Sequence, residues 1–189
     1  MRWDWDSTGD NRVAKMWHLR EELSRSGKVV YAKWYKGRAT FFSKTLAAAL
    51  IRALDHSHPM RSLSRNAHTI HELLLEDSPQ SSKILKKRSE KEQGLTPKEF
   101  DKGLTELWQS LRIVGYGEVD DGAFPSLNIG ATSALFEDLC RKATGLSEKA
   151  AIEDLAPISE TPFIQQLNSF KSRPATGPKV KVIRFSDIQ

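Results

Sequence analysis

The chain has 189 residues, of which 39% are hydrophobic and 28% are charged, and its formal net charge is +5. This length and composition lie in the globular range, and the moderate basic bias is compatible with a polyanionic partner. One cysteine, Cys140, excludes an intrachain disulfide framework, and its apolar neighbours predict a buried thiol. No apolar run approaches the ~20 residues of a membrane helix, and the first residues lack a signal-peptide layout, so we expect a cytoplasmic protein without a membrane partner.

Residues 1–59 predict a helix, a β-hairpin and a second helix, which we interpret as a winged-helix-like subdomain. The first helix covers residues 13–24, and the second begins at Ser43 as a candidate N-cap and ends before Pro59. Alternating residues on either side of Lys36-Gly37-Arg38 predict the hairpin. The predicted apolar face of the first helix consists of Val13, Met16, Trp17, Leu19 and Leu23.

Residues 60–130 predict three helices followed by a two-stranded wing, the order typical of a winged-helix domain. The first helix turns Ala67, Ile70, Leu73 and Leu74 inward, and the second covers residues 80–89. The third starts at Thr96-Pro97-Lys98-Glu99, which predicts a capping box. Residues 113–119 and 124–129 are the expected wing strands.

Residues 131–170 predict further helices, over residues 133–143, 147–155 and 162–170. Residues 171–189 begin with a Pro/Gly/Ser-rich connector, which predicts a flexible tail, with residues 180–185 either a final strand or an unfolded end. The predicted class is therefore α+β, mainly helical, with tandem winged-helix subdomains.

Basic residues gather at two places in the sequence. Lys83, Lys86 and Lys87 form a stripe on the second winged-helix helix, which could bind phosphates or be a solvated face. Around the turn of the first hairpin, basic and aromatic residues alternate, and this pattern is typical of surfaces that grip nucleic acid. For Trp34, Phe41 and Phe42 we favour the core; the basic residues at that turn are Lys33, Lys36 and Arg38.

The third helix offers Lys98, Lys102 and Gln109 on the side away from its apolar residues. Acidic residues complicate this surface, because Glu99, Asp101 and Glu106 lie on the same helix and would repel phosphates. The wing tip is acidic too, with Glu118, Asp120 and Asp121, so we do not expect it to touch a DNA backbone.

Catalytic and metal-binding patterns are weak. His68 and His71 are one helical turn apart, and we interpret them as solvent-facing residues rather than metal ligands. The sequence contains no Walker-type loop, dinucleotide fingerprint or GxSxG elbow, so we expect no cofactor and no metal.

Several segments resemble proteins related to the AlkZ/YcaQ DNA glycosylases. The resemblance covers residues 3–139 and rests on Trp3-Asp4-Trp5, Gly27–Lys33, Gly37–Phe42, Leu104–Leu107, Leu111–Val114 and Gly117–Val119. It implies tandem winged-helix subdomains around a positively charged DNA channel. The Gln-x-Gln or Gln-x-Asp motif of those glycosylases is not found upstream, and Gln165-Gln166 has a different spacing. The chain begins where family members are already under way, so an N-terminal unit is expected to be missing.

These observations predict a protein that binds double-stranded DNA, non-specifically or at damage, whether or not it is an enzyme. The candidate contacts are Lys33, Lys36, Arg38, Lys83, Lys86, Lys87 and Lys98. One alternative is a DNA glycosylase acting on alkylated or cross-linked bases. Another is a winged-helix module that binds a protein partner through its acidic wing.

Overall fold

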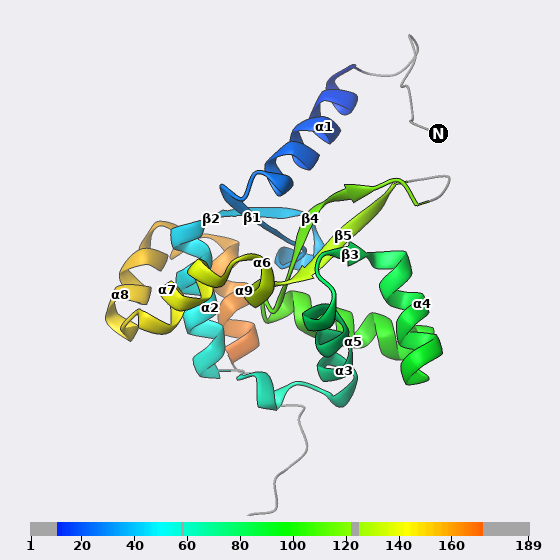
Figure 1. The fold of residues 1–189 in the computed structure, drawn as a ribbon. Helices are drawn as coiled ribbons and strands as arrows, with labels where there is room; N and C mark the ends of the chain where they lie inside the picture. Colours follow the sequence, from blue (N-terminus) through cyan, green and yellow to red (C-terminus); the bar gives the residue numbers. More distant parts are fainter. Residues whose placement is uncertain (1–10, 58, 122–124, 172–189) are drawn as a thin grey trace, which may run out of the picture.

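The computed structural model describes residues 11–57, 59–121 and 125–171, and these residues form one antiparallel sheet surrounded by helices (Figure 1). The strand order is β2-β1-β4-β5-β3. The strands are β1 (Val29–Ala32), β2 (Thr40–Ser43), β3 (Gln80–Ser81), β4 (Ile113–Val119) and β5 (Ser126–Ala131). The helices are α1 (Asn11–Arg25), α2 (Lys44–Ser57), α3 (Arg65–Glu76), α4 (Ser82–Gln93), α5 (Pro97–Gln109), α6 (Thr132–Leu135), α7 (Glu137–Gly145), α8 (Glu148–Leu155) and α9 (Pro162–Lys171). Short 3-10 turns are η1 (Tyr35–Gly37), η2 (Met60–Ser62) and η3 (Ala156–Ile158).

The segment from α3 to β5 has the order that the sequence predicted, with three helices followed by a hairpin. The inward side chains Ala67, Ile70, Leu73 and Leu74 are all buried, as their helical spacing predicted. A short strand, β3, lies between the first two helices and pairs with β5, where Gln80 lies opposite Ile129. This mainly helical α+β arrangement is consistent with a winged-helix-like unit.

The start of α5 is set by local chemistry. The Thr96 hydroxyl accepts a hydrogen bond from the Glu99 N–H at 3.3 Å, and the Glu99 carboxylate accepts one from the Thr96 N–H at 2.9 Å. Pro97 occupies the first helical position, where its missing N–H costs nothing. The predicted capping box is therefore confirmed, and it fixes where the third helix of the unit begins.

The second helix of the unit begins later than predicted, at Ser82 rather than residue 80. Gln80 and Ser81 are extended because they pair with β5. The buried Gln80 side chain donates hydrogen bonds to the carbonyls of Leu73, at 3.1 Å, and Asp77, at 2.8 Å. A strand this short has no periodicity in the sequence, so only its partner strand reveals it.

The first hairpin and the wing belong to the same sheet. β1 pairs with β2 in the predicted hairpin, and on its other edge Tyr31 lies opposite Gly115 of β4. A side chain at Gly115 would overlap the Tyr31 ring, so the approach of the two hairpins depends on this glycine. The division of the chain at residues 59 and 130 stays a prediction.

Helices cover both faces of the joint sheet. α1 contacts β1 and β4 on one face, and α2 contacts β1 and β2 on the other (Figure 1). Residues 47–50 of α2 are fully buried, because this helix lies between the strands and α7, α8 and α9. Three of those four residues are alanines, whose small side chains allow neighbouring helices to approach closely.

The exposed half of α1 differs from the sequence prediction. Met16 and Leu19, expected on an inward face, are 66% and 48% exposed. Only the last turns of α1 meet the sheet, where the Gly117 N–H donates to the Ser24 hydroxyl at 2.9 Å and Arg20 pairs with Glu118. The helix therefore projects from the body of the protein (Figure 1).

A polar cluster joins α2, α3 and β4. Arg112 forms an ion pair with Asp55, and His71 lies close to this pair. Burial, helped by the Arg112 charge, lowers the pKa of His71 to about 4, so this imidazole is neutral near pH 7. His71 is therefore half-buried, where the sequence predicted a solvent-facing residue, and burial is the largest cause of its lowered pKa.

Some predictions lie outside the described residues. They concern the Trp3-Asp4-Trp5 segment, the end of the wing at Gly122 and the tail from residue 172, including the candidate strand over residues 180–185. Among the helices that are described, none is both long and apolar enough to span a membrane.

Replacing Gly115 by alanine tests whether the two hairpins depend on this close approach. The new methyl group would collide with the Tyr31 ring, and we expect a loss of about 1–3 kcal/mol in the free energy of unfolding, as for other overpacked sites. Urea unfolding measures it. The control is Gly145→Ala, where the new Cβ meets no atom within 4 Å, so stability should change by less than about 1 kcal/mol. Equal midpoints for the two variants would contradict the argument.

Candidate nucleic-acid interface

The turn between β1 and β2 is the most exposed basic feature of the first hairpin. Lys36 and Gly37 both have left-handed backbone angles, with φ of 49° and 69°. The Arg38 N–H donates to the Tyr35 carbonyl at 2.9 Å and closes the turn. Lys33, Lys36 and Arg38 are exposed, and none of them forms an ion pair within the described part of the chain.

Trp34 anchors this turn to the rest of the protein. Its indole is 1% exposed, packs edge to face against Phe42, and donates its N–H to the Gln109 carbonyl at 3.0 Å. The sequence-based preference for the core is confirmed for Trp34 and Phe42, which are not free to stack on bases. Phe41 differs, because it is 36% exposed, although its ring contacts that of Tyr31.

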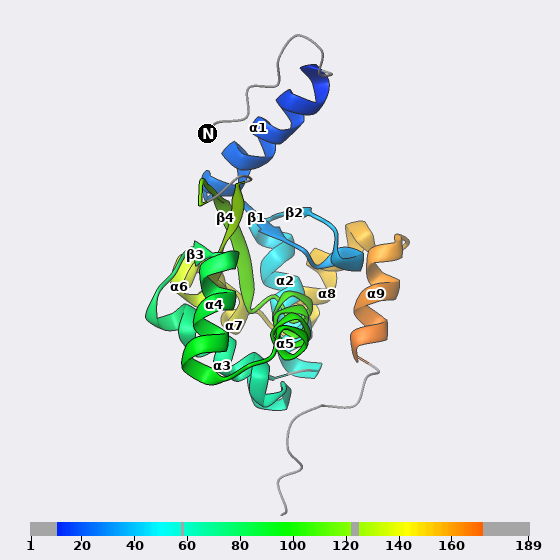
Figure 2. The same ribbon diagram turned by 90° about the vertical axis from the view of Figure 1, so that its right-hand side faces the viewer.

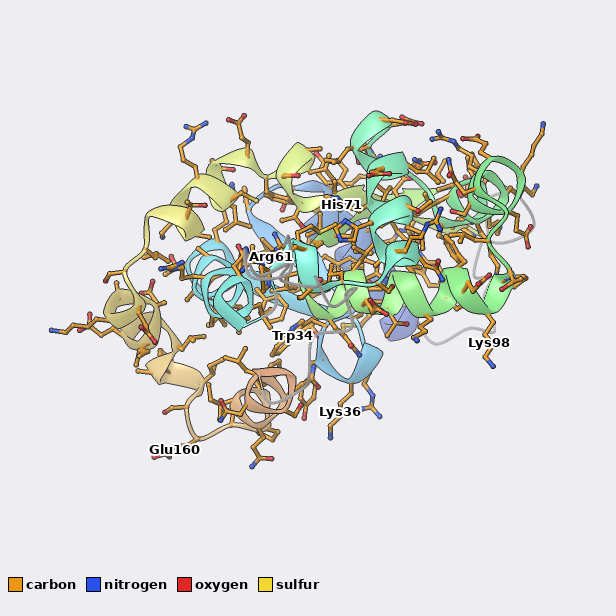
Figure 3. All side chains as sticks on the ribbon, turned by 90° about the horizontal axis from the view of Figure 1, so that it is seen from below. Trp34, Lys36, Arg61, His71, Lys98 and Glu160 are labelled. Atoms are coloured by element: carbon orange, nitrogen blue, oxygen red, sulfur yellow. The ribbon has the colours of Figure 1, made fainter. Side chains whose placement is uncertain are left out.

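The contact between Trp34 and Gln109 places the turn at the carboxyl end of α5. Lys98 and Lys102 are exposed near the amino end of the same helix, four residues apart and therefore on one side of it. At 1.5 Å per residue, Lys98 and Gln109 are separated by about 16 Å along the helix axis. Figure 3 shows Lys36 and Lys98 projecting from the same side of the molecule.

The acidic residues of α5 are all engaged by neighbouring groups. Glu99 belongs to the capping box, and Asp101 forms an ion pair with Lys86 at 3.3 Å. The Glu106 carboxylate accepts the Ser64 N–H at 2.9 Å at the start of α3. Glu99 thus caps α5 itself, whereas Asp101 and Glu106 connect α5 with α4 and with the start of α3, so the acidic residues of the third helix have a structural reason.

The basic stripe of α4 is partly neutralised within the protein. Lys83 forms an ion pair with Asp121 at 3.1 Å, and Lys86 lies over the Phe100 ring while it pairs with Asp101. Lys87 is exposed and forms no ion pair with the described residues. Of the three predicted stripe residues, Lys87 is therefore the one that presents an uncompensated charge.

The two basic regions lie on opposite sides of α5. Figure 2 shows α5 between α4 and the turn η1. Helix α5 contacts both of them, through Asp101 on one side and through Gln109 on the other. The basic turn therefore lies at the carboxyl end of α5, and the stripe is on a separate helix, α4.

The acidic end of the wing is tied back to the protein. Asp121 accepts hydrogen bonds from Ser126, at 2.5 Å, and from Ser81, and it also pairs with Lys83. These donors lower the pKa of Asp121 to about 2, with the Ser126 hydroxyl the largest cause. Glu118 pairs with Arg20, so only Asp120 of the three wing acids lacks an ion pair in the residues described.

Metal and nucleophile chemistry find no support in this part of the molecule. Within residues 11–57, 59–121 and 125–171 no cluster of three or more His, Cys, Asp or Glu side chains could hold a metal ion. Cys140 is half-buried and burial raises the pKa of its thiol, so it is protonated near pH 7.

The Asp121 carboxylate should stabilise the fold in a pH-dependent way. Because its folded pKa lies below the ordinary value, its contribution is present above about pH 4 and is lost as the pH falls toward 2. We expect Asp121→Asn to melt below the wild type at about pH 6 and to approach it at about pH 2. Thermal unfolding followed by circular dichroism measures this. The neighbouring exposed variant Asp120→Asn is the control, and a gap that stays constant with pH would contradict the assignment.

Comparisons with known proteins give one match. The model of the family described as AlkZ related matches residues 2–161. The search of curated proteins and the search of solved structures found no match. The match spans the first hairpin, the three-helix unit with its wing, and α7 and α8. The chain therefore belongs to the AlkZ-related family.

Proposed function

We propose that this protein binds double-stranded DNA, undamaged or damaged, through the basic turn and the exposed side of α5. One observation carries the proposal: Lys36 and Arg38 are held in solvent on a turn whose aromatic base is locked in the core. Because Lys36 and Arg38 form no ion pair with the described residues, they can bind phosphate without first releasing a carboxylate from that part of the chain. Membership of the AlkZ-related family supports an association with DNA repair.

The candidate residues divide into two groups by the state of their charge. Lys33, Lys36, Arg38, Lys87 and Lys98 form no ion pair with the described residues, and we propose that these make the main phosphate contacts. Lys83 and Lys86 would have to exchange a carboxylate for a phosphate, so their net contribution is smaller. Such contacts predict affinity that is independent of sequence and falls with salt. A cytoplasmic location with access to the nucleoid is part of this proposal.

Base excision and protein binding receive less support. The Gln166 amide, one half of the late glutamine pair, is hydrogen-bonded to the backbone of the basic turn on both its oxygen and its nitrogen. It is therefore not available to position a water molecule. An acidic wing that binds a basic protein is weakened in the same way, because Glu118 and Asp121 already have partners.

Removing Lys36 and Arg38, two of the three basic residues at the turn, tests the proposal directly. We expect Lys36→Gln/Arg38→Gln to weaken binding to all duplex sequences alike and to flatten the plot of log affinity against log salt by about two units. Fluorescence anisotropy with random-sequence duplexes at several salt concentrations measures both. The control is Arg141→Gln/Lys149→Gln, which removes equal charge from α7 and α8, at the opposite end of the molecule from α4 in Figure 1. Equal slopes for the two double variants would contradict a role for the turn, and no binding by the wild type at low salt would remove the proposal.

The contribution of the α4 stripe is measured by Lys83→Gln/Lys86→Gln/Lys87→Gln. Because two of these lysines already face carboxylates, we expect the salt slope to flatten by about one unit, less than in the turn variant. Glutamine avoids placing a new negative charge beside Asp101 and Asp121. A slope identical to that of the wild type would discard the stripe as a contact surface.

A further inference from the structure

Helix α9 lies against the basic turn, although Lys36 and Gln166 are 130 residues apart in sequence. Figure 2 shows α9 beside α8 and next to η1. Leu167 is 1% exposed and secures the helix to the core. The family match ends at residue 161 and α9 begins at Pro162, so the match says nothing about this helix.

The Gln166 amide joins the two ends of the turn. Its oxygen accepts the Lys36 N–H at 3.0 Å, and its nitrogen donates to the Trp34 carbonyl at 2.5 Å. One side chain therefore supplies a matched donor and acceptor to backbone groups that are 130 and 132 residues away. An apolar side chain of similar length would fill the same volume and make neither bond.

An aromatic stack lies beside this amide. The Phe163 ring stacks against Tyr35 with a centroid distance of 4.4 Å and lies nearly parallel to Trp34 at 6.3 Å. The Lys36 ammonium lies 5.3 Å from the centre of the Tyr35 ring. Phe163 thus supports the ring on which Lys36 rests, and Gln166 supports the backbone from which Lys36 extends.

The turn requires such support because of its backbone conformation. Lys36 has a φ of 49°, which a residue with a Cβ adopts only at a cost. Its N–H donates to the Gln166 oxygen, and this hydrogen bond favours the left-handed conformation over others in which the amide would face water. Without the amide the turn would exchange among more backbone states, and a binding surface spread over several states has a lower affinity.

We infer that Gln166, assisted by Phe163, is a positioning residue that holds the basic turn in the conformation that binds DNA phosphates. This inference rests on the proposed function. Gln166 itself touches only protein, so its effect on DNA passes through Lys36 and Arg38. In this inference α9, which follows the residues that the family model matches, influences the DNA affinity of the basic turn, which lies within those residues.

The test uses Gln166→Met, which keeps the length and packing of the side chain and removes both hydrogen bonds. Gln165→Met is the matched control, because Gln165 is exposed on the next position of the same helix. The first measurement is hydrogen exchange at the Lys36 amide. We expect exchange to be roughly tenfold faster in Gln166→Met, which corresponds to about 1.4 kcal/mol of lost protection. The control should match the wild type.

The second measurement is duplex affinity, in the native background and in the Lys36→Gln/Arg38→Gln background. We expect Gln166→Met to weaken binding about fivefold in the native background and to have no further effect once both cations are gone. A general loss of folding would instead lower affinity in both backgrounds. Melting temperatures of all variants accompany these data.

The possible outcomes distinguish a failure of the inference about Gln166 from a failure of the proposed DNA-binding function. Unchanged exchange at Lys36 overturns the inference, and so does faster exchange with unchanged affinity. Tighter binding by Gln166→Met overturns it as well, since α9 would then cover the turn instead of positioning it. If the wild-type protein does not bind DNA, the proposed function is wrong, and so is the part of the inference that concerns DNA. The exchange result still decides whether Gln166 holds the turn.

Discussion

The pairing of Tyr31 with Gly115 is the constraint on which the remaining architecture depends. It joins two hairpins from distant parts of the chain into one sheet, and the absence of a side chain at Gly115 permits it. Once β1 is fixed beside β4, the residues that follow β1 must leave the sheet near the end of α5. The Trp34 indole then reaches the Gln109 carbonyl, and the basic turn acquires a defined place relative to the third helix of the winged-helix-like unit.

Internal carboxylates decide how much of the positive charge is available to a partner. A lysine counted from sequence contributes one charge, but Lys83 and Lys86 each lie beside an aspartate from another element. A phosphate must replace that aspartate, and the gain is reduced by the cost of releasing it. The basic residues of the turn form no ion pair with the described residues, so we propose that they contribute more to DNA affinity than the stripe on α4 does. The same pairing explains the acidic wing and the acids of α5, whose carboxylates hold neighbouring elements in place.

The family match and the surrounding structure contribute different information. The match to the AlkZ-related family covers residues 2–161, which include all five strands of the sheet and the helices up to α8. Helix α9 lies after the matched residues and contacts the turn through a single amide and a single phenyl ring. If the basic turn binds DNA as we propose, its affinity would depend on a helix that lies outside the matched residues.

The sequence alone determined the local features of this protein. The capping box at Thr96, the inward face of α3, the hairpin around Gly37 and the order of three helices and a wing all follow from short-range patterns, because caps, turns and periodicity involve residues close together in the chain. Other features were decided only by the tertiary structure. The two-residue strand β3, the exposure of Met16 and Leu19, the partial burial of His71, the partners of Lys83 and Lys86, and the contact of Gln166 with the turn each depend on residues far away in sequence. The fold decides which neighbour each side chain has, and this neighbour determines whether a lysine is paired with a carboxylate or a glutamine supports a turn. Periodicity in the sequence does not show which neighbour that is.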